Sequence, residues 1–174
     1  MSCSVCGVRE GVRRLAVSDN FVSFPDLFVG GHVCGVCAAL FEDRRLRASN
    51  WLLVGDEFRL LGREELLGAL RDPPVNSLIY VKSSGRRYGF LRCMRLRSSK
   101  SAAVVCGEDE GPITVPRERL ARVLDDAVAA YRVLKRKSAL VNGCSPIEWV
   151  HEDACRAVEE HRGDPVWAVV VRAL

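Results

Sequence analysis

The chain has 174 residues, of which 48% are hydrophobic and 28% charged, and its formal net charge is +4 at pH 7. These values are typical of one folded domain, with room for a small metal-stabilised appendage, and they exclude wholesale disorder. No apolar run approaches the roughly 18–20 residues of a membrane span, and the N-terminus lacks a signal-peptide layout. We therefore expect neither a membrane protein nor a secreted one, and no membrane partner.

The first 48 residues contain two C-x-x-C pairs, which are Cys3 with Cys6 and Cys34 with Cys37. Two intervening residues let both thiolates of a pair face one tetrahedral ion, and four sulfur ligands favour Zn²⁺, with an iron–sulfur centre second. Such a site has no open position and would be structural. Two alternatives stay open: His32 could replace Cys3 as a ligand, and the cysteines could be redox-active or incidental.

Residues 51–115 have the pattern of short strands separated by turns. We predict a hairpin over 51–54 and 57–61, a short helix over 64–70 that ends before Pro73 and Pro74, and then a three- or four-stranded antiparallel meander. The meander strands are predicted at residues 78–81, 88–97, 102–106 and 113–115.

The last third of the chain is predicted to hold two helices and a strand. Apolar residues at helical spacing predict a helix over 117–140, which Asn142 and Gly143 stop. Ser145 with Glu148 matches a capping box and predicts a second helix through His161 on an exposed face. The β-branched run after Pro165 predicts a final strand over 165–171.

These elements predict an α+β fold in which an N-terminal zinc-knuckle module, with four cysteine ligands, packs on a small antiparallel sheet with two C-terminal helices. The zinc-binding module covers residues 1–48 and the α+β domain covers 49–174. We expect the two to form one compact unit.

The positive charge is concentrated in residues 73–107, which hold seven basic residues and no acidic one. This stretch favours nucleic acid as a partner, because Lys and Arg neutralise phosphates and an aromatic ring can stack on a base. A solvated sheet face that repels edge-to-edge pairing is the plain alternative. The predicted nucleic-acid-binding residues are Lys82, Arg86, Arg87, Tyr88, Arg95 and Arg97.

A second basic cluster, at Arg132, Lys135, Arg136 and Lys137, is explained more simply by the negative end of the preceding helix dipole. The sequence contains none of the common hydrolase, phosphate-loop or dinucleotide-binding motifs, and we expect no catalysis and no small-molecule substrate. A dyad of Cys155 with His151 is geometrically possible, but a packed thiol is the simpler reading. The same reading applies to the remaining cysteines, Cys93, Cys106 and Cys144.

The order of these features resembles the zinc-finger-containing large subunit of type IV CRISPR–Cas effector complexes. The resemblance covers roughly residues 3–130 and is specific mainly in the combination of its motifs. These are Cys3-x-x-Cys6, Asp19-Asn20-Phe21, Val33-Cys34-Gly35-Val36-Cys37-Ala38, Ser49-Asn50-Trp51-Leu52, Pro73-Pro74 and Ser83-Ser84-Gly85-Arg86-Arg87-Tyr88.

The resemblance implies a prokaryotic, cytoplasmic subunit without nuclease activity that lies beside backbone protein subunits. It would contact guide RNA, target DNA or both, near the motif that flanks the target. A different class of function is also consistent with the sequence. In a pure protein-interaction module, the cysteine knuckles and Phe21, Phe24 and Phe28 would dock a partner, and the basic sheet would be surface only.

Overall fold

The computed structural model describes residues 13–14, 32–33, 35, 49–55, 57–82, 94–107 and 113–174. Within these ranges the fold is mixed α+β, as the sequence predicts. Strands β1 (Arg13–Arg14) and β2 (His32–Val33) pair antiparallel, with Arg14 opposite His32. The rest of the predicted zinc-binding module lies outside the described residues.

The main sheet is antiparallel and has six strands among the described residues, in the order β4-β3-β5-β6-β7-β8. The strands predicted over residues 51–115 are confirmed where they are described, but the sheet is larger than the predicted meander. The hairpin of β3 and β4 joins it, because Trp51 of β3 pairs with Tyr80 of β5. The strands are β3 (Trp51–Val54), β4 (Glu57–Leu60), β5 (Ser77–Val81), β6 (Met94–Ser98), β7 (Ala102–Cys106) and β8 (Ile113–Pro116).

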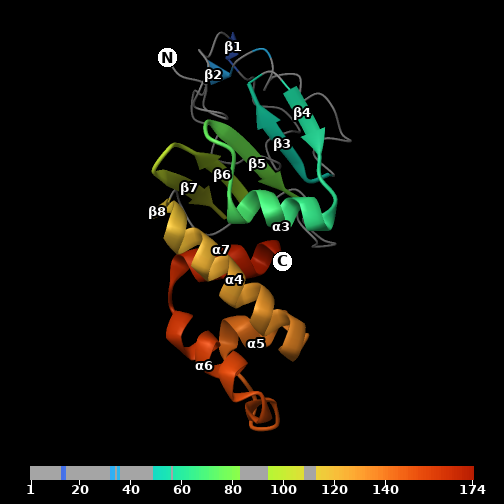
Figure 1. Cartoon of the computed structure of the whole chain (residues 1–174), viewed down its shortest axis with the longest axis vertical. Helices are drawn as coiled ribbons and strands as arrows, with labels where there is room; N and C mark the ends of the chain where they lie inside the picture. The colour runs from blue at the N-terminus through green and yellow to red at the C-terminus, as the bar shows by residue number, and fades with distance from the viewer. Residues whose placement is uncertain are drawn as a thin grey trace.

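One face of this sheet packs on helices. Alternate residues of the strands are buried there together with the apolar sides of α3 (Arg63–Arg71), α4 (Arg117–Leu134) and α7 (Pro165–Ala173). Figure 1 shows the sheet at one end of the molecule, α5 and α6 at the other, and α4 and α7 between them. The sheet residues of this core are Leu52, Ile79, Val81, Leu96, Ala103, Val105 and Val115.

The opposite face of the sheet is also buried along β3 and β5. Trp51 and Tyr80 are at most 1% exposed, and their rings stack with centroids 5.1 Å apart. Phe58 meets the Trp51 ring edge-on at 5.5 Å. Because both faces of β5 are buried, this strand reads as a continuous apolar run, Leu78-Ile79-Tyr80-Val81, rather than as an alternation.

The Pro73-Pro74 segment is tied to the β6–β7 hairpin. Arg117, the first residue of α4, donates hydrogen bonds to Asp72 Oδ1 (3.1 Å), to the Ser99 carbonyl (2.8 Å) and to the Pro73 carbonyl. The buried Ser98 hydroxyl donates to the Pro74 carbonyl. A segment without regular structure is thereby held at a fixed place beside the sheet.

The predicted helix over 117–140 is wrong beyond Leu134. Lys135 adopts a left-handed conformation (φ 55°) and ends α4, and α5 (Lys137–Asn142) starts in a new direction. The new direction brings Ala139 and Leu140 into the core, where both are at most 1% exposed. Lysine is an ordinary helix former, so no local signal predicts this break.

The predicted second helix is also interrupted. A short 3₁₀ segment, η3 (Glu148–Val150), precedes α6 (Glu152–His161). Half of the predicted capping box exists, because the Ser145 N–H donates to Glu148 Oε1 at 2.9 Å. The same carboxylate, however, pairs with Arg136, and the Arg136 and Ser145 hydrogen bonds lower the pKa of Glu148 to about 2. These contacts outside the helix decide where it begins.

Cys144 and Cys155 form a disulfide that joins this segment to α6, with their Cα atoms 5.9 Å apart. The sequence-based reading of these two residues as packed free thiols is therefore wrong, although Cys155 is fully buried as expected. The signal that suggested free thiols was the absence of a secretory context. Gly143 (φ 101°) ends α5 just before Cys144, and α6, which carries Cys155, packs against α5.

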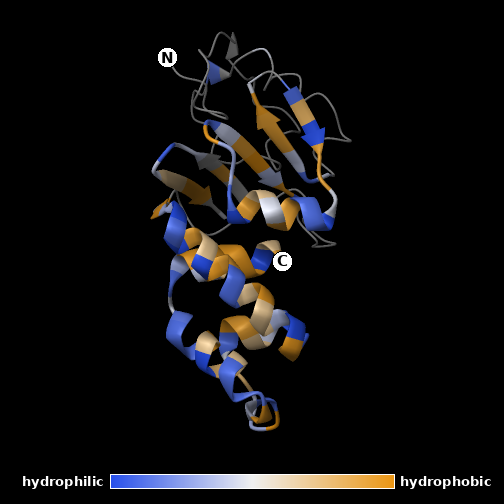
Figure 2. Ribbon diagram, in the orientation of Figure 1, coloured by the Kyte–Doolittle hydropathy of each residue, from blue (hydrophilic) through white to orange (hydrophobic). Residues whose placement is uncertain are grey.

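The predicted final strand is a helix, α7. Asp164 Oδ1 accepts the Val166 N–H at 3.0 Å, and Pro165 occupies the first helical position, which together make a regular N-terminal cap. Figure 2 shows α7 as a strongly hydrophobic helix, and five of its nine residues are buried. A short apolar run does not by itself distinguish a buried strand from a buried helix, and here the cap and the helical surroundings decide.

His161 is buried rather than exposed, which corrects the prediction for α6. Its ring stacks on Trp167 with centroids 4.5 Å apart, and its Nε2 lies 2.8 Å from Asp126 Oδ2. None of the helices that the structure describes combines the length and the hydropathy needed to cross a bilayer.

Candidate nucleic-acid interface

Three of the six predicted nucleic-acid-binding residues lie in the described part of the sheet. Arg95 and Arg97 are in the central strand β6, and Lys82 directly follows β5 and is exposed. The other three, Arg86, Arg87 and Tyr88, lie outside the described residues, in the connection from β5 to β6. The predicted site therefore consists of residues in β6, the residue that follows β5, and residues between these two strands in the sequence.

The register of the sheet places the β6 positions relative to the helices. Arg95 is opposite Tyr80, and Arg97 is opposite Leu78. Directly paired residues share a face of a sheet, so both positions lie on the face opposite α4 and α7. That face is not a uniformly solvated one, because Tyr80 and Leu78 are buried there.

The end of β5 is held by a side chain from the start of the hairpin. Asn50, the residue before β3, accepts the Lys82 N–H through its Oδ1 at 2.9 Å. This bond fixes the point at which the chain leaves the sheet towards the basic connection. Asn50 is one of the residues that carry the family resemblance. Its hydrogen bond to Lys82 gives it a local structural role.

The four predicted zinc ligands, Cys3, Cys6, Cys34 and Cys37, all lie outside the described residues. Their neighbour His32 is described, in β2, and its buried Nδ1 atom has no hydrogen-bond partner among the residues that the structure describes. A ring nitrogen in that state, two residues from a predicted thiolate ligand, fits a metal-binding environment chemically. Within the described ranges themselves, no group of three or more His, Cys, Asp or Glu side chains is arranged to hold a metal ion.

Of the remaining four cysteines, one lies in the sheet and two form the disulfide. Cys106 is the last residue of β7, and Cys93 lies outside the described residues. Cys155 is consumed in the disulfide with Cys144, so the dyad with His151 has no free thiol in this structure. His151 itself is exposed, and its carbonyl accepts the Cys155 N–H at 3.1 Å.

Sequence reasoning missed a cluster of cations around a cavity between α3 and α4. Arg63 at the start of α3 and Arg132 and Lys135 at the end of α4 line a cavity of about 290 Å³. The sequence shows only part of this cluster. The basic residues near 132–137 are adjacent in the sequence, but no local pattern connects them with Arg63, some 70 residues earlier.

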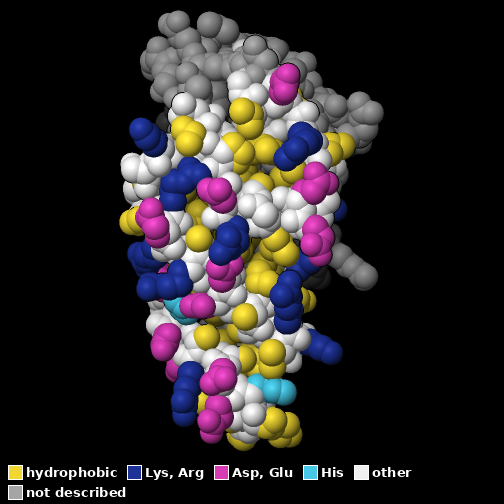
Figure 3. All heavy atoms as spheres, in the orientation of Figure 1, with side chains coloured by type: hydrophobic (Ala, Val, Ile, Leu, Met, Phe, Trp, Pro, Cys, Tyr) yellow, Lys and Arg dark blue, Asp and Glu magenta, His cyan; other side chains and the backbone are white. Residues whose placement is uncertain are grey.

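A second missed feature is the apolar tip, formed by Ile147, Trp149 and Val150 at the end of the molecule away from the sheet. Their exposed fractions are 84%, 38% and 73%. Figure 3 shows hydrophobic side chains gathered at that end. The sequence interpretation placed these residues in a regular helix and so gave no reason to expect them at the surface.

No protein-family model, curated protein or solved structure matches the chain. The functional assignment therefore depends on the residues and their arrangement.

Proposed function

We propose that this chain is a non-catalytic, zinc-stabilised subunit of a ribonucleoprotein complex that binds guide RNA, target DNA or both. The proposal includes membership of a type IV CRISPR effector complex beside its backbone protein subunits, as the resemblance implies. The observation that carries it is the concentration of seven basic residues and no acidic one in residues 73–107. Phosphate contacts supply most of the sequence-independent affinity for nucleic acids.

The arrangement of β5 and β6 supports this assignment. A basic connection between adjacent strands, anchored at one end by the bond from Lys82 to Asn50, can follow a phosphate backbone. Arg95 and Arg97 continue the same basic stretch along β6. In this proposal Lys82, Arg86, Arg87, Arg95 and Arg97 bind phosphates, and Tyr88 stacks on a base.

Zinc would hold the N-terminal module in shape. We expect one zinc ion per purified chain and none in a Cys34→Ser/Cys37→Ser variant, because removing two of four thiolates destroys the tetrahedral site. Elemental analysis of the two proteins measures this directly. The matched control is Cys144→Ala/Cys155→Ala, which also removes two cysteines and should keep its zinc. Wild-type protein without metal would refute the zinc assignment.

Neutralising the basic connection tests the nucleic-acid role. We expect Arg86→Gln/Arg87→Gln to weaken binding of single-stranded RNA and duplex DNA and to reduce the slope of log K against log salt by about 2, one for each phosphate that is no longer neutralised. Fluorescence anisotropy over a salt series measures both quantities. The control Arg122→Gln/Arg156→Gln removes two exposed cations from α4 and α6 and should leave the slope unchanged. An unchanged slope in the first variant would contradict the proposal.

The protein-interaction module is the second candidate, and the apolar tip favours it. The tip is held by the disulfide and by the Arg136–Glu148 ion pair, so little ordering is needed when it binds. The exposed acidic residues Glu152 and Asp153 follow it after His151, which suits a protein subunit with an apolar pocket bordered by basic side chains. Three side chains cover far less than the roughly 800 Å² per partner of a stable interface, so the tip would anchor a larger contact.

Salt dependence separates the two candidates. Binding through phosphates weakens steeply between low and physiological salt, whereas insertion of apolar side chains does not. A complex whose affinity is insensitive to salt, and which survives neutralisation of Arg86 and Arg87, would favour protein docking over nucleic-acid binding.

A further inference from the structure

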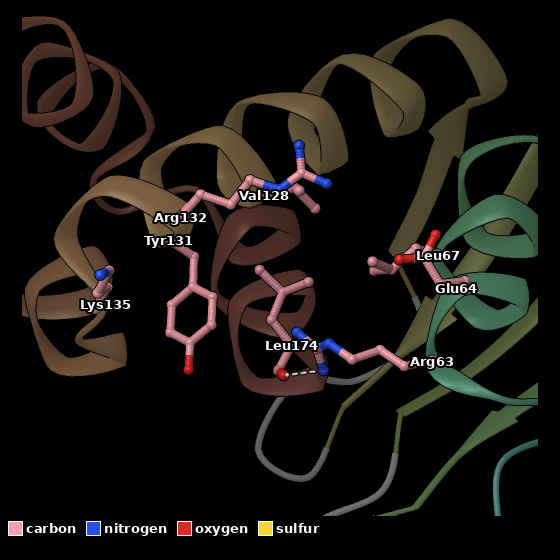
Figure 4. A pocket seen from close by; sticks show the side chains of 8 residues that line it. All are labelled: Arg63, Glu64, Leu67, Val128, Tyr131, Arg132, Lys135 and Leu174. Carbon is pink, nitrogen blue, oxygen red and sulfur yellow. Dashed lines mark hydrogen bonds between the residues drawn. The ribbon is translucent and has the colours of Figure 1, made fainter.

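The cavity between α3 and the end of α4 combines cations with an apolar wall. Its volume is about 290 Å³, and Leu67, Val128 and Leu174 contribute hydrophobic side chains to it. Figure 4 shows the ring of Tyr131 beside Leu174, and the side chain of Arg63 reaching from α3 to Leu174. The size lies at the low end of the roughly 300–1,000 Å³ of small-molecule sites, which suits one small ligand.

The charges around this cavity are unbalanced. Arg63 donates one hydrogen bond to the main-chain oxygen of Leu174 at 2.9 Å. Arg132 and Lys135 are exposed and form no ion pair with any residue that the structure describes. Against these three cations, the side chains of the cavity lining contain one carboxylate, that of Glu64.

A fourth cation, Lys137, adds to the same region. Its pKa is lowered, first by desolvation and then by the positive charge of Arg63. Two like charges close enough to influence each other's protonation destabilise the folded state unless an anion lies between them. The arrangement therefore favours binding of a negatively charged group.

The helix dipole does not explain this cluster as a whole. Arg132 and Lys135 lie at the C-terminal end of α4, where cations are favourable. Arg63, however, is the first residue of α3, and Lys137 is the first residue of α5, where a cation opposes the dipole. Dipole complementation, the reading that the sequence favoured, accounts for only half of the cations that the fold brings together.

We propose that this cavity binds a terminal nucleoside phosphate. Arg63, Arg132 and Lys135 would hold the phosphate, and guanidinium groups suit its oxygens because they can donate two parallel hydrogen bonds. The base or sugar would lie against Tyr131 and the apolar wall, since aromatic rings stack on any base. None of the described residues of the basic stretch lines this cavity, and the inference does not depend on the proposed function.

Calorimetric titration of the full chain at low salt tests the proposal with three probes, which are adenosine monophosphate, adenosine and inorganic phosphate. We expect adenosine monophosphate to bind more tightly than phosphate, and adenosine not to bind measurably. Arg132→Gln/Lys135→Gln should weaken the nucleotide at least tenfold. Tyr131→Leu should weaken the nucleotide but not inorganic phosphate.

The control Arg122→Gln/Arg156→Gln removes the same number of exposed cations away from the cavity and should bind the nucleotide like the wild type. Equal binding by wild type and Arg132→Gln/Lys135→Gln, with circular dichroism showing both folded, would overturn the proposal. Equal affinities for phosphate and nucleotide would overturn the assignment of a nucleoside.

The phosphate could come from a free nucleotide or from the end of a strand. A pentanucleotide with a 5′-phosphate, compared with its 5′-hydroxyl form, distinguishes the two. Tighter binding of the phosphorylated strand than of its hydroxyl form supports the proposal and identifies the end of a strand as the source of the phosphate. Binding of the free nucleotide alone also supports the proposal and identifies a free nucleotide as the source. Failure of both to bind contradicts it, and leaves the salt-slope test of residues 86 and 87 unaffected.

Discussion

Replacing Trp167 by alanine is expected to lower the free energy of unfolding by about 3–5 kcal/mol, a large part of the roughly 5–15 kcal/mol of a typical domain. The side chain is 2% exposed in α7, and its Nε1 donates to the Leu140 carbonyl at 2.8 Å. It also stacks on His161. One residue therefore joins α5, α6 and α7, and its loss leaves both a cavity and an unpaired carbonyl.

Urea denaturation followed by circular dichroism measures this effect, and two further variants separate its causes. Trp167→Phe keeps much of the volume but removes the donor, and should cost about 1–3 kcal/mol for the buried carbonyl left unpaired. Trp149→Ala removes a partly exposed tryptophan of the apolar tip and should cost much less. Equal midpoints for Trp167→Ala and wild type would show that α7 does not pack as described.

Breaking the disulfide between Cys144 and Cys155 is the second large effect. The two residues are 11 positions apart, and closing a loop of about this length stabilises a protein by roughly 2–3 kcal/mol in the chain-entropy model. We expect the oxidised wild type to unfold at higher urea concentration than the reduced wild type or the Cys144→Ala/Cys155→Ala variant.

The reductant provides the internal control for this prediction. It should lower the midpoint of the wild type and leave that of the double variant unchanged, because the variant has no such bond to reduce. Mass spectrometry of a non-reduced digest should find the peptides of Cys144 and Cys155 linked. Identical wild-type midpoints with and without reductant would contradict a stabilising disulfide.

The strands could be predicted from the sequence because their signals are local. Gly55, with φ of 59°, makes the tight turn that the hairpin over 51–61 requires. The helix over 63–71 likewise ends where Pro73 and Pro74 follow it. The extent of the sheet could not be predicted, since the pairing of Trp51 with Tyr80 joins residues 29 positions apart.

The candidate sites divide in the same way. The basic stretch over 73–107 and the cysteine pairs are visible in the sequence, because spacing and charge carry their chemistry. The cavity cluster is not, since Arg63 lines the same cavity as Arg132 and Lys135 only when α3 packs beside α4. The apolar tip depends on the interruption of a helix by Arg136, Ser145 and the disulfide, which local propensity does not contain.

The sequence alone determined the α+β class, the strand positions over residues 51–115 and the concentration of positive charge, because turn residues, alternation and composition act over a few neighbouring positions. The tertiary structure decided that residues 165–173 form a helix, that Lys135 ends α4 and that Cys144 pairs with Cys155. In each of these cases the local preference is weak or opposed. Burial of Leu140 and Trp167 outweighs it, because packing energies of several kcal/mol exceed propensity differences of less than about 1 kcal/mol per residue.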